Sequence, residues 1–315
     1  VIAQDDVSAL ASLDPVTGFI QPILLPTGPN YAGGSAVGGV LHYKDGIWTL
    51  KGAGLPTGGW SGVVSDPADA DRWLLWNNSA AYITSDAGAT WALVDDPFAG
   101  SALTHLITNA AFNPDGSGEW TICGRDRDTF LLANTGVLAR GSGTTRTSQA
   151  TWAADQFFGS GPTGYPTAIA YGNDGTAVIA HMHTGALPGV WRLQPAGALS
   201  SYGTLLTTTN VAFSKIDRYP GLATKIAAVP SSGDALWYAE DYHDAPSEVL
   251  TGGDWAAGAV AASAPHGVYI AGNGFIQVPS ADAPVASVIG LSGLTVGYVA
   301  ADRQTQTVVA ALYDN

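Results

Sequence analysis

Basic residues are scarce in this sequence. Its 315 residues include 12 lysines and arginines against 26 aspartates and glutamates, which gives a formal net charge of −14. A surface of that sign repels nucleic-acid phosphates and anionic lipids. The apolar runs are also too short to span a bilayer. We therefore expect neither a nucleic-acid partner nor insertion into a membrane.

Cysteine is almost absent as well, and the single Cys123 cannot form an internal disulfide. Its flanks, EWTICGRD, predict a strand, so we expect a buried, unreactive thiol rather than a nucleophile. The first residues, VIAQDD, lack the basic segment and apolar core of a signal peptide.

The sequence is instead rich in small and apolar residues. Hydrophobic residues make up 46% of the chain, and 40 glycines and 18 prolines are spread along it rather than clustered. This composition supports a sizeable core and many tight turns between short strands. The length suits one large all-β domain, which we expect to span residues 1–315.

A four-strand phrase recurs along the chain. Residues 61–95 divide into the strands SGVVS, RWLLW, AYITS and WALV, separated by DPADAD, NNSA and DAGA turns. Such apolar pieces between Asp, Pro, Gly and Asn clusters predict an antiparallel meander. Similar phrases begin at Thr108, Thr167 and Thr224, a shorter one at Ala259, and a partial one at Gly38.

The two ends of the chain complete this repeat. Residues 294–315 offer two strands, and residues 5–24 offer the third and fourth strands that would join them. The predicted fold is a single β-propeller of about seven four-stranded blades, closed by strands from both termini. Six or eight blades stay open, because residues 22–39 are hard to parse. A β-sandwich or β-helix explains the recurring phrase less well.

One turn within the repeat, TSDAGATW, has a distinctive spacing. It resembles the Asp box (BNR repeat), S/T-x-D-x-G-x-T-W, of sialidases, sortilin and xyloglucan-active glycoside hydrolases. Residues 43–48, YKDGIW, are a degenerate second copy, and residues 251–255, TGGDW, are a weaker one. The matching positions of the full copy are Thr84, Asp86, Gly88, Thr90 and Trp91.

This resemblance implies a structural role for the turn, between the third and fourth strands of a blade. Asp in a tight turn accepts backbone N–H bonds, and Gly adopts positive φ. The aromatic ring packs between blades. The Phe/Tyr-Arg-Ile-Pro motif of sialidases is absent. The DPADADRW phrase is similar to the xyloglucan hydrolases, but those enzymes use two propellers, and this chain has length for one.

Ligand sites in such folds lie where many loops converge, opposite the Asp-box turns. The connections between second and third strands are predicted to form that face, and they are unusually polar. The candidate ligand-binding residues there are Asn77, Asn78, Arg125, Asp126, Arg127, Asp128, His181, His183, Glu240, Asp241, Tyr242, His243, Asp244 and Asn273.

Several of these residues have more than one interpretation. His181 and His183, two apart on a strand, have the spacing of a metal pair but lack a third ligand in the sequence. Glu240, Asp241 and Asp244 are able to bind calcium, to hold a general acid, or simply to form an acidic surface loop. We expect no required cofactor, with calcium as the open possibility.

The composition and these residues predict a non-catalytic propeller that binds carbohydrate or another cell-surface ligand. Phage tail adhesin, extracellular bacterial module and structural subunit of a larger assembly are the candidate settings, on a virion surface or outside the cell. Trp60, Tyr165 and Tyr242 are candidate exposed aromatics for stacking. The alternative is a glycoside hydrolase, sialidase-like or xyloglucanase-like, with carboxylates from Asp126, Asp128, Glu240, Asp241 or Asp244.

Overall fold

The computed structural model describes residues 23–27, 39–44, 47–56, 60–99, 105–126, 136–151, 164–171, 175, 177–183, 189–193, 204–205, 213–218, 226–230, 235–239, 247–251, 260–263, 267–278, 287–301 and 308–312. These residues form strands, turns and bends, with no helix among them. Accordingly, no helix within these ranges is long and apolar enough to cross a membrane.

The described strands pair into six antiparallel sheets in chain order. The first three sheets are β1(Ile23–Thr27) β2(Gly39–Lys44) β3(Ile47–Lys51); β4(Gly62–Asp66) β5(Asp69–Trp76) β6(Ala81–Thr84) β7(Ala92–Leu93); and β8(His105–Phe112) β9(Glu119–Asp126) β10(Gly136–Ser142) β11(Thr145–Thr151). The last three are β12(Gly164–Tyr171) β13(Ala177–His183) β14(Gly189–Arg192) β15(Thr204–Leu205); β16(Phe213–Arg218) β17(Ile226–Pro230) β18(Ala235–Ala239) β19(Ser247–Thr251); and β20(Val260–Ser263) β21(Gly267–Val278) β22(Ser287–Ala301) β23(Val308–Leu312).

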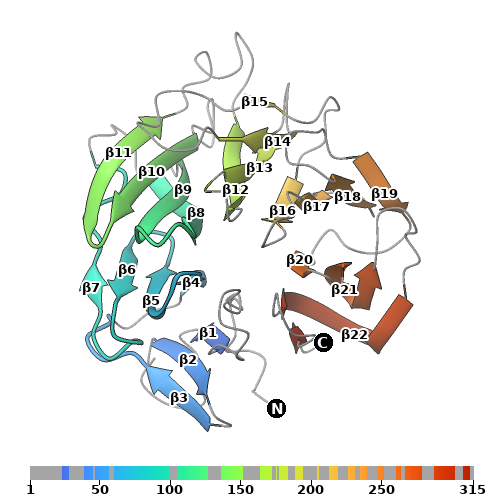
Figure 1. Cartoon of the computed structure of the whole chain (residues 1–315), viewed down its shortest axis with the longest axis horizontal. Helices are drawn as coiled ribbons and strands as arrows, with labels where there is room; N and C mark the ends of the chain where they lie inside the picture. Colours follow the sequence, from blue (N-terminus) through green and yellow to red (C-terminus); the bar gives the residue numbers. More distant parts are fainter. Residues whose placement is uncertain are drawn as a thin grey trace.

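The sheets follow one another around a ring, with the first strand of each nearest the centre (Figure 1). Contacts between successive sheets run through these inner strands: β1 with β4, β4 with β8, β8 with β12, β12 with β16, and β16 with β20. Within each sheet the strands are hydrogen-bonded to one another in chain order. The all-β, up-and-down architecture expected from the repeat is therefore present.

The core lies between neighbouring sheets, and strand alternation explains how it is filled. In the RWLLW run of β5, Trp73 and Leu75 pack with Val40 of the preceding sheet, while Leu74 and Trp76 join the cluster shared with the following sheet. Successive side chains point to opposite faces, so a strand buried on both faces needs a continuous apolar run. Full burial of each such side chain stabilises the fold by about 1.5–3 kcal/mol.

A third cluster joins the sheet of β8–β11 to the sheet of β12–β15. Cys123 lies in it, fully buried, beside Leu138 and Ile169. Burial in this apolar site raises the pKa of the Cys123 thiol well above its ordinary value. The predicted burial of this thiol on a strand is confirmed.

Strand order confirms part of the predicted repeat and corrects another part. Residues 61–95 form the four strands β4–β7, and the phrases from Thr108 and Thr167 begin with the first strands β8 and β12. The phrase from Thr224 was assigned one strand too early. Its IAAVP segment is the second strand, β17, because β16 precedes it and pairs with it.

The C-terminal strands differ from the pattern in length. The 15-residue β22 pairs with β21 through residues 287–295 and with β23 through residues 296–301, so it links two hairpins. Residues 294–315 do supply two paired strands, as expected. Residues 5–22, their expected partners, lie outside the described residues, while Ile23 and Leu24 belong to β1. Ring closure and the number of blades remain predictions.

Candidate functional site

The turn Thr84–Trp91 joins β6 to β7, the third and fourth strands of their sheet, as the pattern predicts. Asp86 Oδ1 accepts hydrogen bonds from Thr84 Oγ1 (2.7 Å) and Thr90 N (2.8 Å), and Oδ2 accepts one from Thr90 Oγ1 (2.6 Å). Gly88 has φ of +75°. The bonds from Thr90, and then that from Thr84, lower the pKa of Asp86 to about 2. Both carboxylate oxygens are therefore occupied within the turn, and Asp86 fastens it.

The aromatic end of the same turn packs inward. Trp91 lies 6.3 Å from Trp73, measured between ring centroids, and contacts the cluster between the first two sheets. A Cβ on Gly88 would lie 2.8 Å from both Lys51 and Trp73, so this turn sits directly against β3. The turn is a contact between sheets, and its carboxylate is used within the turn. The degenerate copy at residues 43–48 spans the β2–β3 hairpin, whose residues 45–46 lie outside the described ranges.

The opposite edge of the sheets, where second strands end and third strands begin, is called the rim below. Asn77 and Asn78 lie there, in the β5–β6 turn, as predicted. Asn77 Oδ1 accepts hydrogen bonds from Ser79 N (2.9 Å), Ser79 Oγ (3.2 Å) and Ala80 N (2.9 Å), so this oxygen is used by the turn. Asn78 is exposed, and its side chain accepts a hydrogen bond from Ser61 Oγ at 3.4 Å.

Arg125 and Asp126 end β9 at the same edge. The Arg125 guanidinium donates to the Tyr165 hydroxyl of the next sheet at 3.1 Å, and its Cζ lies 4.9 Å from the centre of the Tyr165 ring. Both side chains are half-buried. Asp126 is the backbone partner of His105, a rim residue that the sequence reading missed. His105 could have been found from its position at the start of an inner strand, β8.

His181 and His183 lie in the last three residues of β13, also at the rim. Their backbone partners in β12 are Pro166 and Gly164, and they flank Met182, the partner of Tyr165. Hydrogen bonds join the sheets along this edge: Ile107 N donates to Asn78 O (3.0 Å), and Thr108 Oγ1 donates to Pro166 O (2.6 Å). Three neighbouring sheets thus bring six predicted positions to one edge.

Other predicted positions do not belong to the rim. Asn273 was expected in a loop, but it lies inside β21 and pairs with Thr295. The GNG sequence marks a register shift in a long strand instead of a turn. Residues 240–244 were expected between second and third strands, but β18 and β19, which flank them, are the third and fourth strands of their sheet. β18 ends and β19 begins at the edge opposite the rim.

Seven of the candidate residues lie outside the described residues: Arg127, Asp128, Glu240, Asp241, Tyr242, His243 and Asp244. Within the described ranges, no group of three or more His, Cys, Asp or Glu side chains is placed to hold a metal ion.

Of the three aromatic residues considered for ligand stacking, Trp60 was predicted wrongly. It is only 2% exposed and packs edge-on against Tyr82, with ring centroids 5.5 Å apart. Trp60 precedes the inner strand β4, where the neighbouring sheet covers it. Tyr165 is half-buried and faces Arg125. Tyr242 lies outside the described residues.

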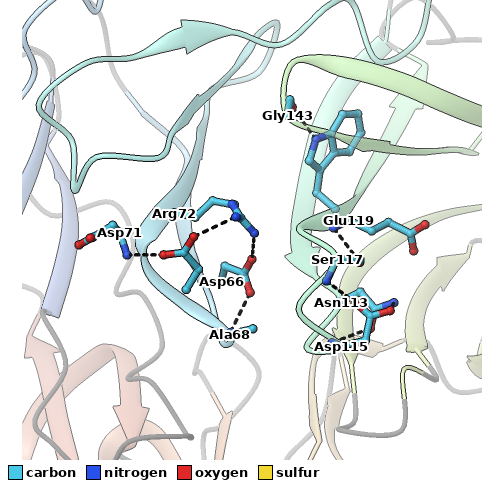
Figure 2. A network of polar contacts seen from close by, with 11 residues as sticks. Asp66, Ala68, Asp71, Arg72, Asn113, Asp115, Ser117, Glu119 and Gly143 are labelled. Carbon is cyan, nitrogen blue, oxygen red and sulfur yellow. Dashed lines mark hydrogen bonds and ion pairs between the residues drawn. The ribbon is translucent and has the colours of Figure 1, made fainter.

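The edge opposite the rim carries an ion-pair cluster that the sequence reading treated as an ordinary turn. Arg72 donates to Asp66 (2.7 Å) and pairs with Asp69 (2.9 Å), while Ala68 N donates to Asp66 Oδ1 (2.8 Å) (Figure 2). Asp66 is fully buried. Burial raises the pKa of Asp66, and this effect outweighs the hydrogen bonds from Ala68 and Arg72, which lower it.

This cluster touches the corresponding turn of the next sheet. A Cβ on Gly118 would lie only 2.4 Å from Arg72 Nη1, so Arg72 packs directly on the backbone of the β8–β9 turn. That turn is held by Asp115, whose Oδ1 accepts a bond from Ser117 N at 2.8 Å (Figure 2). The spacing Asx-Pro-x5-Trp, shared by residues 66–73 and 113–120, was the available signal.

A cluster of buried polar side chains joins the sheet of β8–β11 to the sheet of β12–β15. Thr121 Oγ1 and the Tyr171 hydroxyl are 2.6 Å apart, and Arg140 lies 4.0 Å from Glu119. Burial raises the pKa of the Tyr171 hydroxyl. With Tyr171 6% exposed and Arg140 3% exposed, the group stabilises the contact between sheets and is closed to a ligand.

Comparisons with known proteins bear on the fold alone. No family model and no curated protein matches the chain. Among solved structures, it is similar to a GH74 enzyme of Niastella koreensis (TM-score 0.60, 16% identity), covering 92% of this chain and 48% of that one. It is also similar to virginiamycin B lyase from Staphylococcus aureus (TM-score 0.67, 12% identity), covering 99% and 93%. Both are β-propellers, and this chain has a β-propeller fold.

Proposed function

We propose that the chain is a single, non-catalytic β-propeller that binds carbohydrate through the rim. The observation that carries this proposal is the convergence of Asn78, Arg125 and the β13 histidine positions from three adjacent sheets on one edge. Amide, guanidinium and imidazole groups are suited to reading sugar hydroxyls, and a half-exposed tyrosine adds an apolar face.

The setting that we propose is an extracellular or virion surface, such as a phage tail adhesin or a bacterial surface module. Support comes from the lysine-poor, acidic composition. It also comes from the hydrogen-bonded turn at Asp86, which we interpret as an Asp box. The GH74 neighbour is a glycoside hydrolase propeller, so a related fold acts on sugars. This chain spans about half of that enzyme's length.

The non-catalytic assignment depends on where the carboxylates belong. A glycosidase needs two carboxyl groups about 5–10 Å apart. Asp126 ends a second strand, whereas residues 240–244 connect a third strand to a fourth. Second-to-third and third-to-fourth connections lie at opposite edges of an up-and-down sheet. A pair formed by Asp126 and Glu240 is therefore disfavoured.

The hydrolase alternative keeps pairs within one connection, either Asp126 with Asp128 or two carboxylates among residues 240–244, and the first of these is tested below. Its support is the glycoside hydrolase neighbour. If it were right, the Asp126→Asn variant would bind substrate but not cleave it.

A polysaccharide screen tests both proposals. Wild-type protein is applied to immobilised neutral and acidic polysaccharides, and retained polymers are then assayed for new reducing ends. We expect retention without new reducing ends, and weaker retention for Asn78→Ala. Release of reducing ends that disappears in Asp126→Asn would establish the hydrolase. No retention on any polysaccharide would overturn the carbohydrate-binding proposal.

A further inference from the structure

Arg125 differs from the other arginines whose side chains the structure describes. Arg72 pairs with Asp66 and Asp69, and Arg140 lies near Glu119. Arg146 donates to the carbonyl oxygen of Ala99 at 2.6 Å. Within the described residues, Arg125 has neither a carboxylate nor a backbone carbonyl partner, although acidic residues outnumber basic ones by more than two to one in this chain.

The Arg125 guanidinium is nevertheless held in place. The Tyr165 hydroxyl accepts one of its five N–H bonds at 3.1 Å, and the Tyr165 ring lies 4.9 Å below Cζ. Cation–π contact and a hydrogen bond together fix the plane of the guanidinium. The remaining N–H groups are the donors that a carboxylate engages in pairs.

We propose that Arg125 recognises the carboxylate of an acidic saccharide, of the uronic-acid class, and that Tyr165 is the residue that positions it. This inference rests on the proposed carbohydrate-binding function of the rim. The net charge of −14 repels a polyanion at long range, so recognition depends on a short, directed contact. A planar, bidentate pair supplies such a contact, and a point charge does not.

The competing interpretation is that Arg125 and Tyr165 only fasten two sheets together. The two roles differ in what a substitution changes. Loss of a fastener lowers the melting temperature and affects all ligands equally. Loss of a carboxylate contact changes the preference between an acid and its ester and leaves other binding intact.

The test measures binding of polygalacturonate and of its fully methyl-esterified form, which lacks the charge. The variants are Arg125→Lys, Arg125→Gln and Tyr165→Phe. Arg146→Gln is the matched control, because it removes one positive charge from outer strand β11 of the same sheet.

We expect wild-type protein and Arg146→Gln to prefer the acid. In Arg125→Gln we expect a loss of about ten-fold or more in affinity for the acid, and little change for the ester. Arg125→Lys should recover only part of the loss, and Tyr165→Phe should reduce the preference. An unchanged acid-to-ester ratio in Arg125→Gln overturns the inference and leaves carbohydrate binding standing. Failure of wild-type protein to bind either form or any neutral polysaccharide overturns both.

Discussion

Substitution of Gly118 by alanine tests how the turns of neighbouring sheets interlock. Gly118 has φ of +68°, which costs an L-residue about 1–2 kcal/mol. The new Cβ would also lie 2.4 Å from Arg72 Nη1. An arginine tip normally moves aside at little cost, but this one is held by Asp66 at 2.7 Å and Asp69 at 2.9 Å.

Moving Arg72 removes the charged partner of Asp66, which has no exposed surface. A hydrogen bond to a charged group contributes about 1.5–3 kcal/mol, and a buried charge left without its partner costs more. The bond to Asp69 is exposed and adds little. Gly118→Ala should therefore lower the free energy of unfolding by about 2.5–5 kcal/mol, the sum of the backbone and ion-pair costs.

Gly116→Ala is the matched control. Gly116 has φ of +82°, but the nearest atom to its Cβ, that of Ala68, is 3.9 Å away. Only the backbone cost of about 1–2 kcal/mol applies to it. In an Arg72→Ala background, the loss of unfolding free energy caused by Gly118→Ala should fall to the same backbone cost. Urea and thermal unfolding of the wild type, Gly118→Ala, Arg72→Ala and the double variant measure the coupling, and Gly116→Ala is measured beside them. Equal effects of the two glycine substitutions, or no coupling with Arg72, would refute the interlock.

Three further predictions concern stability and reactivity. Asp86 has a pKa lowered to about 2 from 3.8, so its ionised form stabilises the fold above about pH 4, and this stabilisation is lost as pH falls towards 2. Melting temperatures between pH 2 and 6 should show a smaller acid-induced decrease in Asp86→Asn, and an identical pH profile would contradict this. The Cys123 thiol should not react with a thiol reagent at pH 8 until the protein unfolds, because burial raises its pKa; rapid modification of the native protein would disprove burial. Gly62→Ala should cost about 3 kcal/mol, because its Cβ would lie 2.1 Å from the buried ring of Trp76, and wild-type stability by urea unfolding would contradict the packing.

Local features of this chain could be predicted because local residues decide them. The four strands within residues 61–95 and the Asp86 turn follow from apolar runs and turn residues adjacent in sequence. The buried thiol of Cys123 follows from its strand in the same way. The rim positions of Asn77, Asn78 and Arg125 were also predicted, because the order of the flanking strands within their sheets was assigned correctly from the sequence.

The errors came from features that depend on distant parts of the chain. The segment from Thr224 was numbered one strand early, because a strand's position in its sheet is set by its partners and not by its own residues. As a result, residues 240–244 were predicted between a second and a third strand, whereas the strands that flank them, β18 and β19, are the third and fourth of their sheet. Asn273 was predicted in a loop because Gly next to Asn is common in turns. The same residues also suit a bulge within a long strand, and the structure has a register shift there.

The sequence by itself determined that the chain forms short antiparallel strands joined by tight turns, because hydrophobic alternation and turn chemistry act over a few residues. Tertiary structure alone decided that Trp60 is covered by a neighbouring sheet, that Arg72 packs on Gly118, and that Arg125 meets Tyr165. These contacts join residues about 20 to 50 positions apart, and only the packing of one sheet on the next brings them together.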